Sequence, residues 1–469
     1  MCLSKCTRKG IVLDGHIGAC VERVKNIFAG GKRCYIATFG CQMNAHDSEK
    51  LAGLLAAMGF APAAGEKDAD VIVYNTCCVR ENAENKVYGK LGYLKHLKES
   101  KPGLKIALCG CMTQRDEALE RLQRVYRHVD VIFGTYNLDR FPELLLAAYE
   151  SGGMVVDVWK EHGAIAEDLP ALRDNPYKAG VNIMYGCNNF CTYCIVPYVR
   201  GRERSRTPAD VLAEVRRAAD AGAKEILLLG QNVNSYGHGL ETPVTFAELL
   251  DEVANVNGIM RVRFMTSHPK DLSDALIAAV RDNPKVCKHI HLPFQSGSTE
   301  VLRRMNRRYT KDDYLALAAK IQAEIPDAAL TTDIIVGFPG ETEADFQDTM
   351  DVARQVRFHG AYTFLYSKRS GTPAAVMDDQ VPDDTAHERF DRLLAVVNDI
   401  VYDRNRAQEG KTAAVLAEEY DAKRSVVTGR ADDNSIVHFQ GTEADAGQMI
   451  QVKITEGKPF YLMGEQIES

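Results

Sequence analysis

Short apolar runs alternate with helix-like patterns twice along this 469-residue chain, and this alternation limits the fold more than any other feature. In the first stretch the pattern predicts strands at 33–38, 69–75, 104–109 and 129–133, and helices at 47–58, 80–97, 115–126 and 138–149. Strand–helix alternation of this kind is typical of a parallel, doubly wound α/β sheet.

The second alternating stretch is longer and contains six strand–helix units. Its predicted strands are 181–185, 225–229, 261–265, 289–292, 330–336 and 361–365. Its predicted helices are 208–221, 245–256, 272–282, 299–304, 311–323 and 343–356, followed by a closing helix at 383–402. Six such units predict a parallel β/α barrel, partial or complete, with its site at the carboxyl ends of the strands.

The last 66 residues differ in character, because five short strands are separated by turns that contain Gly, Asp and Asn. These strands predict a small closed antiparallel β-barrel, a shape often used to bind nucleic acid. The segment 404–469 carries eight basic and eleven acidic residues, so its charge by itself favours a structural module. The predicted domains are an N-terminal extension at 1–31, an α/β domain at 32–150, a linker at 151–177, a β/α domain at 178–402 and a β-barrel at 403–469.

Three cysteines lie at equivalent places in the first domain. Cys41, Cys77 and Cys111 each follow a predicted strand, 36 and 34 residues apart. Because residues just beyond the carboxyl ends of parallel strands converge in one crevice, the three thiols are predicted to meet at one site. The neighbouring Cys78 and Cys109 can substitute for them as ligands, although burial as a small apolar side chain is the commoner role.

A second cysteine set follows the first strand of the predicted barrel. Cys187, Cys191 and Cys194 have the spacing C-x3-C-x2-C, and the aromatic Tyr193 precedes the third thiol. A structural zinc site needs four ligands, whereas three thiolates on a cluster of four irons leave one iron open to a small chelating molecule. The spacing therefore favours an iron–sulfur centre with an open iron over a zinc loop.

Composition places the chain among globular proteins, with 45% hydrophobic and 26% charged residues. No apolar run is long enough for a membrane helix, and no secretion signal is visible. Thirteen cysteines suit a reducing compartment, so we expect a cytoplasmic protein without membrane association. The net charge of −7 gives no global case for nucleic acid, but Arg200–Arg206 contains four arginines. That run indicates either a solvated face or an anionic substrate.

Several motifs, in order, resemble the radical S-adenosylmethionine (SAM) methylthiotransferase family, most closely its bacterial tRNA 2-methylthio-N6-isopentenyladenosine synthases. The matching segments are Gly40–Asn44, Asn75–Arg80, Cys109–Met112, Tyr185–Arg202, Gly230–Tyr236, Ser267–Pro269, His291–Ser298 and Asp333–Thr342. The resemblance implies an N-terminal methylthiotransferase cluster domain, a radical SAM domain and a C-terminal RNA-binding domain of the TRAM type.

The resemblance also implies two 4Fe–4S clusters. Cys187, Cys191 and Cys194 would hold the cluster that cleaves SAM, and Cys41, Cys77 and Cys111 would hold an auxiliary cluster concerned with sulfur. SAM would serve both as methyl donor and as the source of a 5′-deoxyadenosyl radical. The implied substrate is an isopentenyl-modified adenosine beside the anticodon, modified at carbon 2. Implied partners are the tRNA anticodon stem-loop and an electron donor such as flavodoxin or ferredoxin, with a monomeric enzyme and an unidentified sulfur donor.

Four further residues are candidates for contact with SAM or substrate. Gln231, Gln295 and Asp333 stand at predicted strand ends, where capping the strand is an equally good explanation. Tyr193 can lie against SAM or pack the cysteine loop. Two alternative functions remain open: methylthiolation of an aspartate on a ribosomal protein, which uses the same cluster residues, and a non-catalytic iron–sulfur RNA-binding protein.

Overall fold

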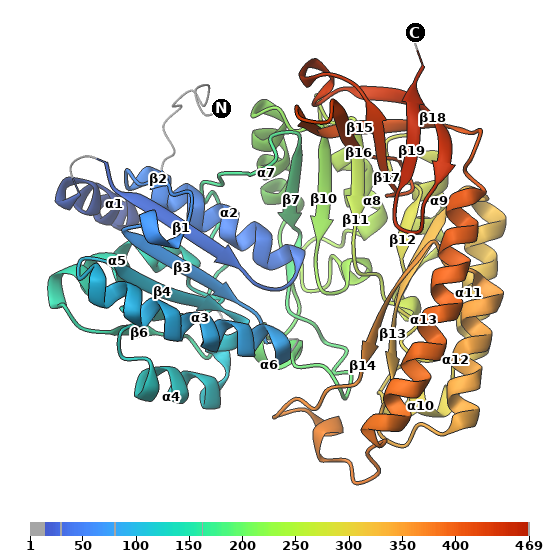
Figure 1. Cartoon of the computed structure of the whole chain (residues 1–469), viewed down its shortest axis with the longest axis horizontal. Helices are drawn as coiled ribbons and strands as arrows, with labels where there is room; N and C mark the ends of the chain where they lie inside the picture. The colour runs from blue at the N-terminus through green and yellow to red at the C-terminus, as the bar shows by residue number, and fades with distance from the viewer. Residues whose placement is uncertain (1–14, 29–30, 79–80, 162, 468–469) are drawn as a thin grey trace. The chain divides into compact units, whose positions relative to one another are not determined.

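The computed structural model describes residues 15–28, 31–78, 81–161 and 163–467 (Figure 1). Cys2 and Cys6 of the predicted extension lie outside the described residues. The chain divides into two compact units. The N-terminal unit comprises Met1–Asp174, Tyr185–Asn188 and Ile195–Arg206, and the C-terminal unit comprises Asn175–Met184, Asn189–Cys194 and Thr207–Ser469.

The N-terminal unit is built on a six-stranded sheet in the order β2-β1-β3-β4-β5-β6, with every pairing parallel. Its strands are β1 (Arg33–Thr38), β2 (Ala61–Pro62), β3 (Val71–Thr76), β4 (Lys105–Gly110), β5 (Val131–Phe133) and β6 (Val155–Asp157). Every residue of the central strand β3 is buried, as expected for a parallel strand covered on both faces.

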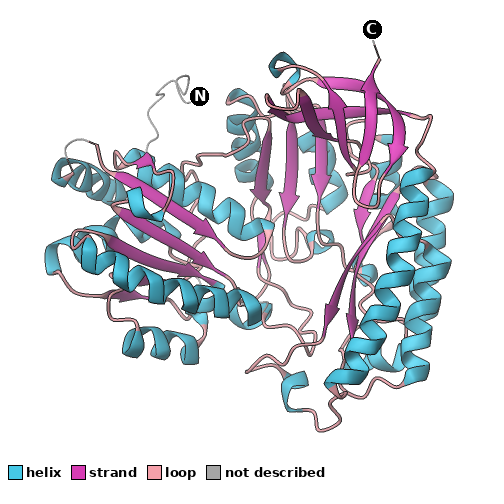
Figure 2. Ribbon diagram, viewed as in Figure 1, coloured by secondary structure: helices cyan, strands magenta, loops and turns pink. Residues whose placement is uncertain are grey.

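Helices cover both faces of this sheet (Figure 2). The helices are α1 (Gly15–Ile27), α2 (Gln42–Ala57), α3 (Glu81–Ser100), α4 (Asp116–Val125) and α5 (Phe141–Ser151). Apolar residues of α1, α2 and α5 share one buried cluster with the sheet, and apolar residues of α3 and α4 share another. The doubly wound sheet predicted from the sequence is confirmed.

The structure differs from the sequence predictions at both ends of this unit. Residues 15–27 of the predicted extension form α1, whose Cys20, Val21 and Val24 are buried in the core. The predicted linker begins with β6, which pairs with β5 at the edge of the sheet. Both segments are therefore integral to the N-terminal unit.

The C-terminal unit begins with six parallel strands, β7 (Lys178–Asn182), β10 (Glu225–Leu229), β11 (Arg261–Phe264), β12 (His289–His291), β13 (Ala329–Val336) and β14 (Gly360–Leu365). Hydrogen bonds order them as β7-β10-β11 and β12-β13-β14, and a parallel bridge between Val262 and Val286 joins the two sets. No strand pairing is found between β7 and β14 in the described residues, so the barrel is partial. Two short strands, β8 (Met184–Tyr185) and β9 (Arg204–Ser205), flank the second cysteine set in sequence.

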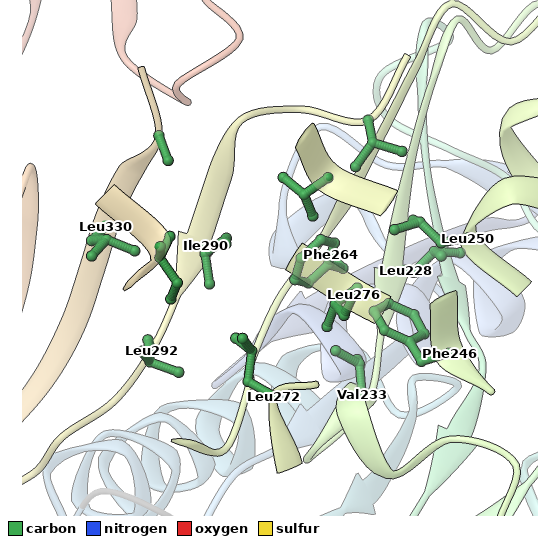
Figure 3. Close-up of a cluster of buried hydrophobic side chains, with 14 of the residues drawn as sticks. Leu228, Val233, Phe246, Leu250, Phe264, Leu272, Leu276, Ile290, Leu292 and Leu330 are labelled. Atoms are coloured by element: carbon green, nitrogen blue, oxygen red, sulfur yellow. The ribbon is translucent and has the colours of Figure 1, made fainter. Parts of the chain in front are cut away.

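Helices follow these strands and bury a continuous apolar core (Figure 3). They are α7 (Pro208–Asp220), α8 (Phe246–Ala254), α9 (Asp274–Asp282), α10 (Thr299–Arg304), α11 (Lys311–Glu324), α12 (Glu343–Val356) and α13 (Asp383–Arg406). Six of them begin at a Ser or Thr whose side chain accepts a hydrogen bond from the third helical residue, as at Thr245 before α8. The short α6 (Val196–Val199) belongs to the N-terminal unit. Among the described residues, no helix is both long and apolar enough to cross a membrane.

The chain ends in a closed barrel of five strands in the order β15-β16-β17-β19-β18. Their bounds are β15 (Thr412–Asp421), β16 (Val426–Arg430), β17 (Ile436–Gln440), β18 (Met449–Gly457) and β19 (Leu462–Gln466). Four pairings are antiparallel, and the β17–β19 pair is parallel. The small barrel is confirmed, with a mixed rather than wholly antiparallel sheet.

Within the C-terminal unit, this barrel packs against the ends at which β10 and β11 begin (Figure 1). Arg263 donates to the carbonyl oxygens of Asp432 at 2.8 Å and Ala431 at 2.5 Å. Its Nε lies 3.1 Å from a carboxylate oxygen of the buried Glu225. Arg261 likewise donates to the carbonyl oxygens of Arg430 and Ala414. The contact between the two barrels is therefore polar and largely desolvated.

We expect Arg263→Met to destabilise the C-terminal unit by about 3 kcal/mol, because it leaves a buried carboxylate and two carbonyl oxygens with fewer partners. Chemical denaturation of the full chain, combined with proteolysis at the junction of α13 and β15, measures the change. Arg281→Met is the matched control, because Arg281 makes its ion pairs on the surface and its loss should leave the unfolding midpoint unchanged. Equal midpoints for the two variants would contradict the prediction.

Candidate functional site

Three cysteines lie just after the carboxyl ends of strands at one edge of the N-terminal sheet. Thr38 pairs with Asn75 at the end of β1, and Thr76 pairs with Gly110 at the end of β4. Cys77 and Cys111 are the next residues after these pairs, and Cys41 is the N-cap of α2. The register thus places the three thiols beyond the carboxyl ends of three adjacent parallel strands, where ligand sites of such sheets are found.

Glycines before two of these cysteines allow a close approach of the loops. A Cβ atom at Gly40 would lie 2.7 Å from Cβ and 2.9 Å from Sγ of Cys77. A Cβ at Gly110 would lie 2.3 Å from the carbonyl oxygen of Thr76. Both glycines have a positive φ, at 117° and 98°, so other residues would be strained as well as crowded.

Asn44 fixes the loops that carry the first two thiols. Its Nδ2 donates to the carbonyl oxygens of Phe39 at 2.7 Å and Thr76 at 3.0 Å. Its own carbonyl oxygen accepts from Nδ2 of Asn75 at 2.8 Å. These bonds account for the asparagines in the segments Gly40–Asn44 and Asn75–Arg80 that the sequence singled out.

Arg200 completes this site from a distant part of the sequence. Its side chain is buried at the end of α6, and its Nε donates to Sγ of Cys111 at 3.3 Å. Its Nη2 donates to Oδ1 of Asn44 at 2.6 Å and to Oδ2 of Asp47 at 2.9 Å. The site therefore combines three thiols with one buried cation and one buried carboxylate.

A hydrogen bond links the thiols of Cys78 and Cys111. A hydrogen bond with Cys78 is the main cause that lowers the pKa of Cys111, and the Arg200 guanidinium lowers it further against the opposing effect of burial. The same hydrogen bond and burial raise the pKa of Cys78. Cys109 belongs to the core shared with α1, α2 and α5, and burial raises the pKa of its thiol. Of the two neighbouring cysteines, Cys78 is thus the one in contact with the site.

Of the second cysteine set, Cys187 belongs to the N-terminal unit, and Cys191 and Cys194 belong to the C-terminal unit. In the N-terminal unit, the backbone N–H of Cys187 donates to the carbonyl oxygen of Gly201 at 3.1 Å. In the C-terminal unit, the N–H of Cys194 donates to the carbonyl oxygen of Cys191 at 2.9 Å, which forms a tight turn around Tyr193. The Tyr193 side chain packs against a buried cluster that contains Met305 and Phe338.

The loop 189–194 is anchored to the segment after α10. Nδ2 of Asn306 donates to the carbonyl oxygens of Asn189 at 3.1 Å and Phe190 at 3.0 Å. The buried Arg307 places Nη1 3.8 Å from Sγ of Cys191, while its Nη2 donates to the carbonyl oxygen of Pro293 at 2.6 Å. Like Cys111, Cys191 therefore faces a buried guanidinium, which the sequence analysis did not anticipate.

Two of the predicted cofactor contacts are brought together in the barrel. The N–H of Gln295 donates to the carbonyl oxygen of Asp333 at 2.9 Å, and Gln295 adopts a positive φ of 65°. His291 on β12 places Nε2 3.5 Å from a carboxylate oxygen of Asp333. Its Nδ1 lies 3.0 Å from Oγ1 of Thr331, in a polar row along β12 and β13. Gln231 lies two residues beyond the end of β10.

Both candidate sites present three cysteine thiols. Within the described residues, no group of three or more His, Cys, Asp and Glu side chains is arranged to hold one metal ion. A cluster of four irons sets its thiolate ligands farther apart than one ion does, and cysteine thiolates are its usual ligands. The close packing of Gly40 on Cys77 and the guanidinium on Cys111 suit a site for such a cluster.

Comparison with protein families identifies each part of this arrangement. The Radical SAM superfamily matches residues 181–353, and the TRAM domain matches residues 406–467. A further family, described as the uncharacterized protein family UPF0004, matches residues 33–134. The chain is therefore a radical SAM protein with an N-terminal UPF0004 domain and a C-terminal TRAM domain. Radical SAM proteins use a 4Fe–4S cluster and SAM.

Named relatives narrow this class of radical SAM proteins to one family. A tRNA-2-methylthio-N(6)-dimethylallyladenosine synthase of Lachnoclostridium phytofermentans is 54% identical over 434 residues, 92% of this chain and 95% of the relative. The synthase of the same name from Acetivibrio thermocellus is 57% identical over 442 residues, 94% of this chain and 92% of the relative. The chain belongs to the tRNA-2-methylthio-N(6)-dimethylallyladenosine synthase family.

Among solved structures, the fold is similar to that of the radical SAM methyltransferase TsrM from Kitasatospora setae. The TM-score is 0.52 at 13% identity, over 74% of this chain and 77% of that one. At this identity the similarity concerns the fold alone, and it agrees with the partial barrel and α/β sheet described above.

Proposed function

We propose that this protein attaches a methylthio group to carbon 2 of an isopentenyl-modified adenosine beside the anticodon of tRNA. The observation that carries the proposal is the presence of two thiol sites in one chain. That chain is 54–57% identical to named synthases along almost its whole length. One site follows the strand ends of the N-terminal sheet, and the other follows the first barrel strand.

Cys187, Cys191 and Cys194 would hold the cluster that, when reduced, supplies the electron for SAM cleavage. Arg307 and Asn306 hold their loop in place. Gln231 and Gln295 lie beyond the carboxyl ends of β10 and β12, where contacts with SAM and the adenosine are expected. Asp333 lies within β13, not at its end as the sequence predicts, and its carbonyl oxygen accepts from the N–H of Gln295. Tyr193 packs the loop between its two cysteines against the C-terminal unit.

Cys41, Cys77 and Cys111 would hold an auxiliary cluster, which would supply an iron site for the sulfur that is transferred. Gly40, Gly110 and Asn44 shape the loops for that role. We further propose a cytoplasmic monomer that receives electrons from a flavodoxin or ferredoxin. These partners follow from the low potential that SAM cleavage requires.

Mass spectrometry of tRNA nucleosides tests the proposal directly. The purified protein is incubated anaerobically with SAM, a reductant and tRNA that carries isopentenyladenosine, and the expected product is its 2-methylthio derivative. Unmodified tRNA, together with a methylthiolated aspartate in a ribosomal protein mixture, would favour the alternative activity. Absence of 5′-deoxyadenosine would favour a non-catalytic role.

The TRAM barrel offers one exposed aromatic side chain for contact with RNA. Phe460 lies in the turn between β18 and β19 and is 75% exposed. The turn closes by a hydrogen bond from the N–H of Lys458 to the carbonyl oxygen of Tyr461 at 2.9 Å, and Tyr461 packs edge-on against His438. An aromatic ring held on a rigid turn can stack on an unpaired base.

We expect Phe460→Ala to weaken tRNA binding by about 5- to 150-fold, because base stacking contributes about 1–3 kcal/mol. Filter binding at fixed salt measures the affinity, and tRNA-independent SAM cleavage should not change. Ile467→Ala is the control, because Ile467 is an exposed aliphatic residue of the same domain. If both variants bind tRNA like the unaltered protein, Phe460 does not contact the RNA.

A further inference from the structure

Arg200 lies only six residues after Cys194 but belongs to the N-terminal unit, where it contacts the auxiliary thiol site. The flanking Ile195 and Val199 are buried in the same apolar cluster as Cys111 and Met112. Apolar packing therefore holds the backbone that carries Arg200, and hydrogen bonds orient its guanidinium. Arg200 has no part in the chemistry proposed above.

The guanidinium of Arg200 divides its hydrogen bonds between the thiol and two oxygen acceptors. Nε faces Cys111, and Nη2 faces Asn44 and Asp47, at distances of 2.6–3.3 Å. The side chain is 4% exposed, so water does not screen these charges strongly. Other arginines of the same run have different partners: Arg206 pairs with Glu167, and Arg204 donates to the carbonyl oxygen of Gly163.

A fixed cation at a ligand thiolate has a predictable effect on an iron–sulfur cluster. Reduction adds one negative charge, and a nearby positive charge or an N–H···S hydrogen bond stabilises the reduced form. The Asp47 carboxylate forms an ion pair with the same guanidinium. Because it is negatively charged, it is expected to destabilise the reduced form of the cluster. Arg200 and Asp47 are therefore expected to have opposite effects on the reduction potential of the cluster.

We propose that Arg200 is a positioning residue that holds the Cys111 thiolate and raises the reduction potential of the auxiliary cluster, with Asp47 opposing it. This inference rests on the auxiliary cluster of the proposed function. It explains why an arginine next to the SAM-cleaving loop is buried in the N-terminal unit instead of facing solvent.

The test uses the full chain with Cys187, Cys191 and Cys194 changed to alanine, so that only the auxiliary cluster gives a signal. Anaerobic redox titration followed by electron paramagnetic resonance then measures the ratio of reduced to oxidised cluster. Arg200→Gln is expected to lower that ratio about tenfold at a given potential, a shift of about 59 mV to lower potential. Asp47→Asn is expected to shift it in the opposite direction, because the amide keeps an acceptor oxygen but loses the charge.

Two further variants separate charge from folding. Arg200→Lys keeps the positive charge and should retain most of the potential, whereas Arg206→Gln removes a buried arginine of the same run and should leave the potential unchanged. Shifts of the same sign for Arg200→Gln and Asp47→Asn, or no shift in either, would overturn the inference. If the background protein binds no iron, the auxiliary cluster of the proposed function fails instead, and iron analysis shows this before any titration.

Discussion

Replacing Cys191 with alanine is expected to abolish reductive cleavage of SAM. Cys191 is buried, it accepts the hydrogen bond that closes the turn to Cys194, and its thiol faces Arg307. Three thiolates on a cluster of four irons leave one iron without a protein ligand, and SAM would bind at that iron. Loss of one thiolate is therefore expected to remove this site. Because mutation of an outer-shell partner alone costs about 10–100-fold at metal sites, we expect cleavage to fall by more than about 100-fold.

Anaerobic assay of 5′-deoxyadenosine measures this loss, and iron analysis accompanies it. The auxiliary site lies in the other unit, so the variant should retain about half of the iron of the unaltered protein. Cys287→Ala is the matched control: Cys287 is equally buried in the C-terminal unit but lies in the barrel wall beside Arg263. Cleavage near the unaltered rate in Cys191→Ala would remove Cys191 from the site.

Strand positions were predictable where apolar runs and strand ends coincide. The bounds of β1 and β10 are those predicted, because each is an apolar run bounded by polar or glycine residues. The predicted first barrel strand, 181–185, begins three residues later than β7 does in the structure. Ile183 and Met184 are apolar and buried but lie beyond β7, whereas the strand begins at Lys178, whose ammonium group lies 3.0 Å from Glu418 of the small barrel. A sequence pattern cannot show such a tertiary partner.

Short edge strands and the closure of the small barrel were also beyond the sequence. β2 has two residues and β6 has three, too few for a periodic pattern. The parallel pairing of β19 with β17 joins strands separated by β18 in sequence, and the alternation of side chains is the same for parallel and antiparallel neighbours.

The candidate sites were predictable only in part. The convergence of Cys41, Cys77 and Cys111 follows from a general property of parallel sheets, and the register of the strand ends agrees with it. The contact between Arg200 and Asn44 joins residues 156 positions apart, so no local pattern signals it. The arginine run indicated a solvated face or an anionic substrate, and neither describes Arg200, which is buried against a thiol and a carboxylate.

Replacing Cys77 with alanine is expected to separate the two proposed reactions. The variant should keep SAM cleavage, because the three cysteines proposed for that cluster are unchanged and Arg307 still faces Cys191. It should lose methylthiolation by more than about 100-fold, because the auxiliary site loses a buried ligand at the end of β3. Nucleoside mass spectrometry and the 5′-deoxyadenosine assay on the same reaction give both quantities.

Cys78 provides a further test of this prediction, because its thiol is hydrogen-bonded to Cys111 and it follows Cys77 directly in sequence. If Cys78 takes over as a ligand, Cys77→Ala retains some methylthiolation and the double variant Cys77→Ala/Cys78→Ala loses it. Cys109→Ala is the control, since Cys109 belongs to the core under the other face of the sheet and its loss should leave both reactions intact. Full methylthiolation in the double variant would exclude the end of β3 from sulfur insertion, and the auxiliary site would then have to be sought elsewhere in the chain.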